Sequence, residues 1–292
     1  MKVAAPGKLV ITGAYVVLEG APAIVCAVDR YAYAEDRDGL ATREVSAALD
    51  PAPAIDSSAL EDAGRKLGLG SSAAGLVAAL GLRRAQAGDD LQAENVRREI
   101  FERARDVHAR VQNGGSGVDV AASTFGGVLH YTLGSIEPVQ LPRGVSVTAF
   151  FSGTSARTSD LRARVDALAA RDPNEHGARM SLLREIANGA HRAVRSGDGV
   201  AFIAAVASTG EGLTALGVAA DAPIVPPTFV ELGARAKSEG AAFIPSGAGG
   251  GDVGIFVGPA PSASFADAAR AAGMKLLGLA IESRGVHVAE KH

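Results

Sequence analysis

The chain has 292 residues, of which 47% are hydrophobic and 21% charged, and its formal net charge is −3. This length and apolar content are sufficient for about two domains with a large core, and they exclude an intrinsically disordered chain. A protein that binds nucleic acid mainly through phosphates would carry an excess of basic residues, which is missing here. Cys26 is the only cysteine. A disulfide framework and a cysteine metal cluster are therefore excluded, as is typical of the cytoplasm.

Membrane-spanning and secretory segments are not predicted either. The sequence contains no run of about 20 uninterrupted apolar residues, so a transmembrane helix is not predicted. The first residues are apolar, as in a secretory signal, but Pro6, Gly7 and Lys8 interrupt them before a hydrophobic region forms. We therefore expect a soluble, cytoplasmic protein, a monomer or a homodimer, that acts on a small-molecule substrate and has no membrane or nucleic-acid partner.

The first half of the chain predicts strands followed by helices. The strands are short and are separated by glycine or proline; they cover residues 9–12, 15–18, 23–27 and 31–34. Residues 36–66 are polar and rich in alanine, which predicts a connector or reduced insertion with only a weak strand near Val45. Two helices follow, an apolar one at 71–87 and an amphipathic one at 91–112, whose arginines we expect mostly to face water.

The second half is mainly helical after two further strands. Those strands are expected at 128–131 and 145–151, and after Gly153 the sequence pattern changes from strands to helices. Helical segments are predicted at 159–171, 176–196, 198–216 and 228–239. Strands at 241–244 and 253–257 then flank a glycine-rich loop, and a helix near 262–272 precedes strands at the end. A domain boundary is predicted near residue 145.

The glycines that precede the first helix can hold a phosphate. Residues 67–74 read Leu-Gly-Leu-Gly-Ser-Ser-Ala-Ala, so free backbone amides and serine hydroxyls meet at a helix start. A helix cap with a tight turn explains the tract equally well when it is taken alone. No buried strand precedes the glycines and no acid ends a following strand, which disfavours a dinucleotide-binding oxidoreductase. The only Gly-Lys pair, Gly7-Lys8, precedes Leu9 and lacks the earlier glycine of a Walker A loop.

Two later glycine tracts each end in an aspartate. Residues 113–119 read Asn-Gly-Gly-Ser-Gly-Val-Asp, and residues 245–252 read Pro-Ser-Gly-Ala-Gly-Gly-Gly-Asp. An acid directly after a flexible glycine loop can place its carboxylate against a ligand or a metal. Aspartate also favours turns for local reasons, so each tract alone is about as typical of a turn as of a site.

Together with Pro6-Gly7-Lys8, the three tracts resemble the GHMP kinases, the superfamily of galactokinase, homoserine kinase, mevalonate kinase and phosphomevalonate kinase. Order and spacing match over nearly the whole chain. Within the superfamily the chain looks most like the phosphomevalonate kinases; the residues that carry this likeness are 108–112, 115–122, 152–158 and 245–252.

This resemblance implies an α+β fold of two domains. Residues 1–145 would form a mixed α/β nucleotide-binding domain, and residues 146–292 a ferredoxin-like α+β domain. The implied activity is transfer of the γ-phosphoryl group of ATP, with Mg²⁺, to phosphomevalonate, which gives diphosphomevalonate and ADP. A mevalonate kinase or another GHMP small-molecule kinase is an alternative, and so is a catalytically silent nucleotide-binding relative.

The resemblance also assigns residues. Lys8 and Asp119 would be catalytic, and Lys8 supplies the point charge that a transferring phosphoryl group needs. ATP would be held by Gly68, Leu69, Gly70, Ser71, Ser72 and Ala73, with Mg²⁺ at Ser72. The residues expected to bind the substrate are Tyr15, Arg110, Ser116, Gly117, Ser155, Arg157, Ser246, Gly247, Gly249 and Asp252.

Three residues depart from the superfamily pattern. Ala14 stands where the first motif usually has glutamate, although phosphomevalonate kinases often lack that residue too. Mevalonate kinases carry a magnesium-binding glutamate at the spacing of His108, which argues against that activity and leaves the second metal ligand unassigned. We expect His108 to be a half-buried structural histidine. Arg157 replaces a serine that is frequent in related kinases.

Overall fold

The computed structural model describes residues 1–37, 39–154 and 158–290 and contains two compact units. Unit 1 consists of Met1–Leu9, Val25–Pro138 and Ala280–His292, and unit 2 consists of Val10–Ile24 and Val139–Leu279. Both ends of the chain therefore belong to unit 1. The predicted division into continuous stretches, 1–145 and 146–292, differs from this arrangement because the last strand returns to the first.

The sheet of unit 1 is built on two long strands, β1 (Lys2–Thr12) and β2 (Ala23–Glu35). Its order is β12-β1-β2-β6-β7, with β3 also paired to β2. The last strand, β12 (His287–Val288), pairs antiparallel with β1. After Lys2 every residue of β1 is buried, which is typical of a strand covered on both faces. The other strands of this unit are β3 (Ala54–Asp56), β4 (Glu61–Asp62), β5 (Arg65–Lys66), β6 (Val128–Thr132) and β7 (Ser135–Val139).

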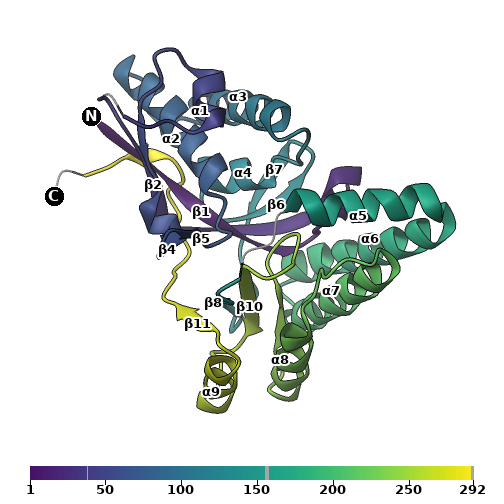
Figure 1. Cartoon of the computed structure of the whole chain (residues 1–292). Coiled ribbons are helices and arrows are strands. Elements are labelled where there is room, and N and C mark those ends of the chain that lie inside the picture. Colours follow the sequence, from purple (N-terminus) through teal and green to yellow (C-terminus); the bar gives the residue numbers. More distant parts are fainter. Residues whose placement is uncertain (38, 155–157, 291–292) are drawn as a thin grey trace. The chain divides into compact units, whose positions relative to one another are not determined.

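Four α-helices lie beside the long strands of unit 1 (Figure 1). They are α1 (Arg43–Ala48), α2 (Ser71–Gln86), α3 (Glu94–Val111) and α4 (Val118–Phe125), with a 3-10 turn, η2, at Ser58–Leu60. Helix α2 is buried continuously from Ala73 to Leu82, because its alanines and glycines let neighbouring elements approach closely. Helix α3 buries one stripe, as its periodicity predicts.

The strands predicted near the N-terminus are longer or of another type in the structure. The predicted strand at 9–12 is the end of β1, and those at 23–27 and 31–34 are both parts of β2. The predicted strand at 15–18 is wrong, because a 3-10 turn, η1 (Val16–Glu19), ends there at the left-handed Gly20. The weak strand near Val45 is also wrong. That segment is α1, whose start is capped by the Thr42 hydroxyl.

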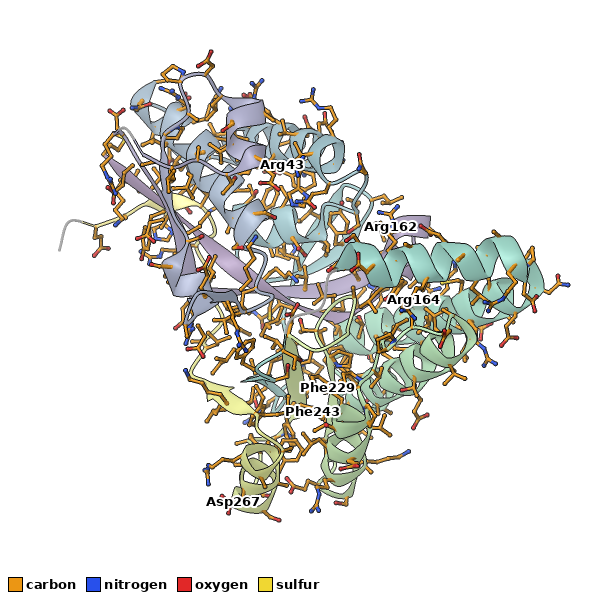
Figure 2. All side chains as sticks on the ribbon, viewed as in Figure 1. Arg43, Arg162, Arg164, Phe229, Phe243 and Asp267 are labelled. Atoms are coloured by element: carbon orange, nitrogen blue, oxygen red, sulfur yellow. The ribbon has the colours of Figure 1, made fainter. Side chains whose placement is uncertain are left out.

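Unit 2 combines an antiparallel sheet with helices. The sheet order is β11-β8-β10-β9, with antiparallel pairing throughout. Phe229 and Phe243 contact each other at 5.3 Å between ring centroids in the core of this unit (Figure 2). The elements are α5 (Thr158–Arg171), α6 (Pro173–Ser196), α7 (Gly199–Ala219), α8 (Pro227–Ser238), α9 (Ala263–Ala271), β8 (Ser146–Phe151), β9 (Ala242–Pro245), β10 (Val253–Gly258) and β11 (Lys275–Leu277).

Three helix starts in unit 2, those of α6, α7 and α9, follow local capping rules. The start of α7 was predicted at 198, one residue before Gly199, whereas the start of α6 was predicted at 176, three residues after Pro173. Asp172 caps α6 by accepting a hydrogen bond from the Glu175 amide at 3.0 Å, and Asp198 caps α7 in the same way. By length and composition α7 could also cross a membrane. In unit 2 it contacts α6, β9 and β10.

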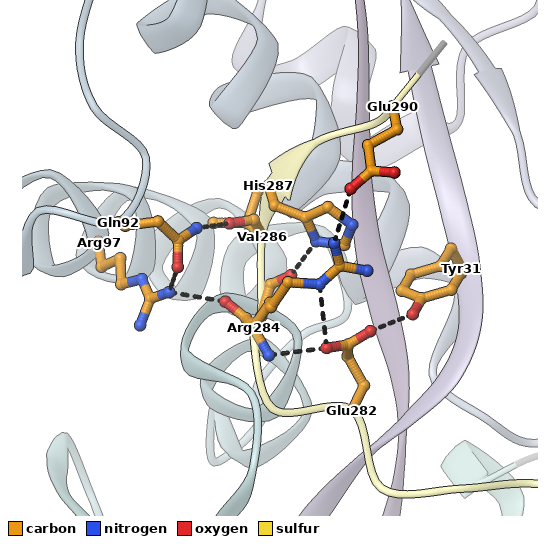
Figure 3. Close-up of polar contacts among 9 residues, drawn as sticks. Tyr31, Gln92, Arg97, Glu282, Arg284, Val286, His287 and Glu290 are labelled. Carbon is orange, nitrogen blue, oxygen red and sulfur yellow. Dashed lines mark hydrogen bonds and ion pairs between the residues drawn. The ribbon is translucent and has the colours of Figure 1, made fainter. Parts of the chain in front are cut away.

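A polar network fastens the C-terminal segment within unit 1 (Figure 3). The buried carboxylate of Glu282 accepts hydrogen bonds from the Tyr31 hydroxyl and, at 2.7 Å, from the Arg284 amide. Gln92 and Arg97 donate to backbone carbonyls of the same segment at 2.9 and 2.6 Å. Burial raises the pKa of Glu282, but hydrogen bonds from Tyr31 and Arg284 outweigh it, so the pKa lies below its usual value.

Replacing Glu282 by glutamine is expected to lower the free energy of unfolding by about 1–3 kcal/mol, because Tyr31 and Arg284 lose a charged acceptor at a buried position. Urea denaturation measures this loss. The stability that the ionised Glu282 contributes is fully present above the ordinary carboxyl pKa, and it is lost as the pH falls through the lowered pKa of the folded protein. The difference in the free energy of unfolding between wild type and Glu282→Gln therefore becomes smaller in acid. Glu290→Gln is the control, because that carboxylate is 80% exposed. Equal losses in both variants would contradict this account.

Candidate active site

The Pro6-Gly7-Lys8 segment of β1 lies directly against the loop that precedes α2. The Lys8 amide donates a hydrogen bond to the Leu69 carbonyl at 2.9 Å. A Cβ atom on Gly7 would stand 2.9 Å from that same oxygen, so only glycine permits this approach. The Ser123 hydroxyl of α4 donates to the Pro6 carbonyl at 2.8 Å. One segment of β1 therefore contacts both the loop that precedes α2 and helix α4.

The loop delivers an uncapped helix start. Gly68 and Gly70 have φ of 73° and 78°, which is the left-handed region that favours glycine. Gly70 is the N-cap of α2, and within the described residues no side chain caps this end. The first backbone hydrogen bond of the helix is donated by the Ala74 amide to the Gly70 carbonyl. The amides of residues 71–73 and the helix dipole are thus available to an anion.

Lys8 and Asp119 form an ion pair beside this loop. The Lys8 Nζ lies 3.5 Å from Asp119 Oδ1 and donates to the Gly68 carbonyl at 3.3 Å. The Lys8 side chain is 8% exposed and that of Asp119 is 32% exposed, so the ammonium is the buried partner. A buried cation needs such oxygen partners to be stable. A Cβ on Gly70 would stand 3.2 Å from Lys8 and 3.5 Å from Asp119 Oδ2, which places all three together.

The tract before α4 is held by residues of α3 and β6. The Tyr131 hydroxyl donates to the Ser116 carbonyl, and Gly117, with φ of 82°, is the N-cap of α4. A Cβ on Gly117 would stand 2.8 Å from Arg105 Cγ. We expected the α3 arginines mostly to face water, but the stem of Arg105 covers this glycine. Helical periodicity gave no signal for that contact, because Arg105 lies outside the apolar stripe.

Two other α3 residues have different surroundings. His108 is half-buried, and its Nε2 lies 3.1 Å from the Ser72 hydroxyl at the start of α2. Its partner is therefore a residue of the predicted ATP loop, which the sequence did not reveal. Arg110, predicted to bind substrate, is exposed, and its Nε donates to the Asp106 carbonyl of its own helix at 3.4 Å. The described contacts do not link Arg110 to Lys8 or Asp119.

In unit 2, the loop at 246–252 is anchored by residues of the N-terminal segment. The buried Tyr15 hydroxyl donates to the Ala248 carbonyl at 2.8 Å, and the Val10 amide donates to the Ser246 hydroxyl at 2.9 Å. Burial raises the pKa of Tyr15 well above its usual value, so the phenol stays protonated. Tyr15 and Ser246, which were both predicted to bind the substrate, therefore hold this loop in its conformation.

The glycines of the same loop permit close backbone contact. Gly247 and Gly249 have φ of 88° and 84°. A Cβ on Gly249 would stand 2.0 Å from the Ile224 carbonyl, to which the Gly250 amide donates at 2.8 Å. Asp252 donates its amide to the Thr154 carbonyl at 3.0 Å. Ser155 and Arg157, also predicted to bind substrate, lie outside the described residues.

One protein-family model matches part of unit 1. Residues 39–127 match the family model described as GHMP kinases N terminal domain. The chain carries a GHMP kinase N-terminal domain. The resemblance predicted from its glycine motifs is thereby confirmed.

The chain is similar to two curated enzymes and to a solved complex. A phosphomevalonate kinase from Streptomyces sp. (strain CL190) is 27% identical, over 86% of this chain and 88% of the relative. A mevalonate kinase from Aeropyrum pernix is 30% identical, over 55% of this chain and 60% of the relative. The Streptococcus pneumoniae phosphomevalonate kinase in complex with phosphomevalonate and AMPPNP superposes with a TM-score of 0.79 at 19% identity, covering 96% and 99% of the two chains. The predicted α+β GHMP kinase fold is confirmed.

The geometry predicts that Gly70→Ala weakens nucleotide binding at least about tenfold, because its methyl group enters the space against Lys8. Isothermal titration with ADP measures the affinity. Gly64→Ala is a matched control, since Gly64 has nearly the same φ of 77° but has nothing within 4 Å of its Cβ position. Both variants should lose about 1–2 kcal/mol of stability through backbone strain. Equal ADP affinity in the two variants would contradict the assignment of this loop.

Proposed function

We propose that the chain is an ATP-dependent kinase that transfers the γ-phosphoryl group to phosphomevalonate and releases diphosphomevalonate and ADP. The observation that carries this proposal is the Lys8–Asp119 pair beside Gly70 at the uncapped start of α2. An anion-binding helix end and a fixed cation are what phosphoryl transfer requires. The curated relative that aligns over 86% of the chain is named as a phosphomevalonate kinase, which supports this acceptor.

In this mechanism the backbone of the loop that precedes α2 binds the ATP phosphates. Lys8 neutralises negative charge on the phosphoryl group that is transferred. An ammonium has three N–H donors, of which the Gly68 carbonyl and Asp119 use two. The third can donate to a phosphoryl oxygen. Because Gly68 and Asp119 hold the ammonium in place before the reaction, its charge needs little reorganisation during transfer.

The acceptor determines what Asp119 must do. The second ionisation of a phosphate monoester has a pKa of about 6, so the acceptor phosphate is already an anionic nucleophile at neutral pH. One of its oxygens attacks the γ phosphorus, and the bond from that phosphorus to the β–γ bridging oxygen breaks, with the electron pair leaving on ADP. No proton has to be removed. We therefore assign Asp119 to holding Lys8 rather than to general base catalysis.

Magnesium fits the oxygen donors of this site. Among the described residues no group of three or more His, Cys, Asp and Glu is suited to hold a metal. Mg²⁺ in kinases is bound mainly by substrate phosphates and water with one or two protein oxygens, and the Ser72 hydroxyl is such an oxygen. When bound, the ion would neutralise charge on the β- and γ-phosphates.

Mevalonate is the second candidate acceptor, supported by the Aeropyrum pernix relative. Its alcohol keeps a tightly held proton, so this reaction needs a base, and Asp119 is the carboxylate available beside Lys8. A coupled assay of ADP release with mevalonate, phosphomevalonate, homoserine and galactose separates these acceptors. A catalytically silent relative would release no ADP with any of them.

For phosphomevalonate, Lys8→Met is expected to lower kcat by about 10²–10³, the loss typical of one removed electrostatic contact. Asp119→Asn should cost less, because it loosens the ammonium without removing the charge. Lys66→Met is the control, since Lys66 is an exposed lysine close to the loop in sequence. If mevalonate is the preferred acceptor and Asp119→Asn loses about a thousandfold, Asp119 is a general base and the proposed acceptor is wrong.

A further inference from the structure

A buried carboxylate in α1 has no role in the transfer described above. Glu44 lies in the first turn of α1 and is 6% exposed. Its Oε1 accepts a hydrogen bond from Gln112 Nε2 at 2.6 Å. Charged side chains are rarely buried without a specific partner, so this one needs an explanation.

Gln112 follows α3, and His108 lies one helical turn earlier, so the two side chains are on neighbouring positions of one face. The His108 Nε2 is 3.1 Å from the Ser72 hydroxyl, and its Nδ1 is 3.9 Å from the position that a Cβ atom on Gly115 would take. Helix α1 contacts both α2 and α3. The Glu44–Gln112 contact thus joins α1 to the end of α3, and the His108–Ser72 contact joins α3 to the start of α2.

The charge of Glu44 is maintained within this group. Burial raises its pKa, but hydrogen bonds from its own amide, Gln112 and Thr42 outweigh that effect and bring the pKa below its usual value. Its charge also interacts with His108. The carboxylate is therefore ionised at neutral pH and can bind the amide of Gln112 firmly.

We propose that Glu44, Gln112 and His108 are positioning residues that orient the Ser72 hydroxyl. In this arrangement Ser72 donates its proton to His108 Nε2, and the lone pairs of its oxygen face the anion-binding end of α2. That the hydroxyl then serves bound Mg²⁺ and nucleotide rests on the proposed kinase function.

The direction of the Ser72 proton follows from what a cation requires. A hydroxyl has one donor and two acceptor sites. An oxygen that faces Mg²⁺ must present a lone pair, so its proton has to point to an acceptor elsewhere. His108 Nε2 can be that acceptor only when Nδ1 carries the ring proton. A hydroxyl that donated directly to a phosphate would instead favour the Nε2–H form of His108.

Nitrogen NMR of the protein without ligands tests the tautomer independently of activity. The chain has six histidines, so a ¹⁵N-histidine sample is compared with His108→Gln to assign the ring. At a pH of about 8, where an ordinary imidazole is neutral, we expect the Nδ1–H form at His108. Ser72→Ala should shift the Nε2 resonance. An Nε2–H form in the wild type, or an Nε2 resonance that Ser72→Ala leaves unchanged, would overturn the proposal.

Enzyme kinetics test the rest of the chain of contacts. Glu44→Gln and Gln112→Leu are expected to raise the KM for MgATP about tenfold, the lower limit typical of residues that support a metal ligand, with a smaller change in kcat. His108→Gln should retain more nucleotide affinity than His108→Ala, because its amide oxygen can still accept the Ser72 proton. Glu102→Gln is the matched control for the loss of a carboxylate, because Glu102 is exposed on α3, the helix that carries His108.

The two proposals fail in different ways. A wild-type protein that releases no ADP with any acceptor would refute the kinase function, while the NMR experiment would still decide the orientation of Ser72. An active kinase with the Nε2–H tautomer would refute only the positioning role. If Glu44→Gln does not fold, Gln112→Leu tests the same step, and an unchanged KM for MgATP in that variant would contradict the role of the buried acid.

Discussion

The candidate active site of unit 1 depends on one constraint. The Lys8 ammonium is buried next to the main chain of the loop that precedes α2. A buried cation is stable only with oxygen partners, and here they are the Gly68 carbonyl and Asp119. These partners belong to the loop before α2 and to the first turn of α4. Satisfying one charge therefore fixes the relative positions of a strand, a loop and two helix starts. The same contacts leave the ammonium close to the anion-binding end of α2.

Glycine makes this arrangement sterically possible. Gly7 lets β1 approach the Leu69 carbonyl, and Gly70 provides both a left-handed turn and space beside Lys8. In unit 2, Gly249 lets its loop approach the Ile224 carbonyl. At Gly7 and Gly249, glycine is thus used where two segments of backbone meet. Side chains then hold these loops in place, as Tyr15 does for the loop at 246–252.

Behind the reacting groups, buried polar side chains stabilise the geometry. Glu282 fastens the C-terminal segment to β2 through Tyr31, and Glu44 of α1 binds Gln112 at the end of α3. Both carboxylates have a pKa below the usual value, because hydrogen bonds to the ionised form outweigh burial. Each acid joins segments that are distant in sequence. The charges of the unit therefore act as connections between elements as well as in the site.

The sequence by itself determined the long helices, the family and the groups that meet at Lys8. Capping residues, helical periodicity and glycine tracts are local signals, and local signals also place Gly70 and Asp119 at helix starts. Only the tertiary structure showed that residues 15–18 form a turn and that β12 returns to β1. It also showed that Arg105 lies against Gly117, that His108 meets Ser72, and that Glu44 binds Gln112. Those features depend on pairing between distant segments. Such pairing is decided by packing and by the need to satisfy buried polar groups, neither of which a short stretch of sequence contains.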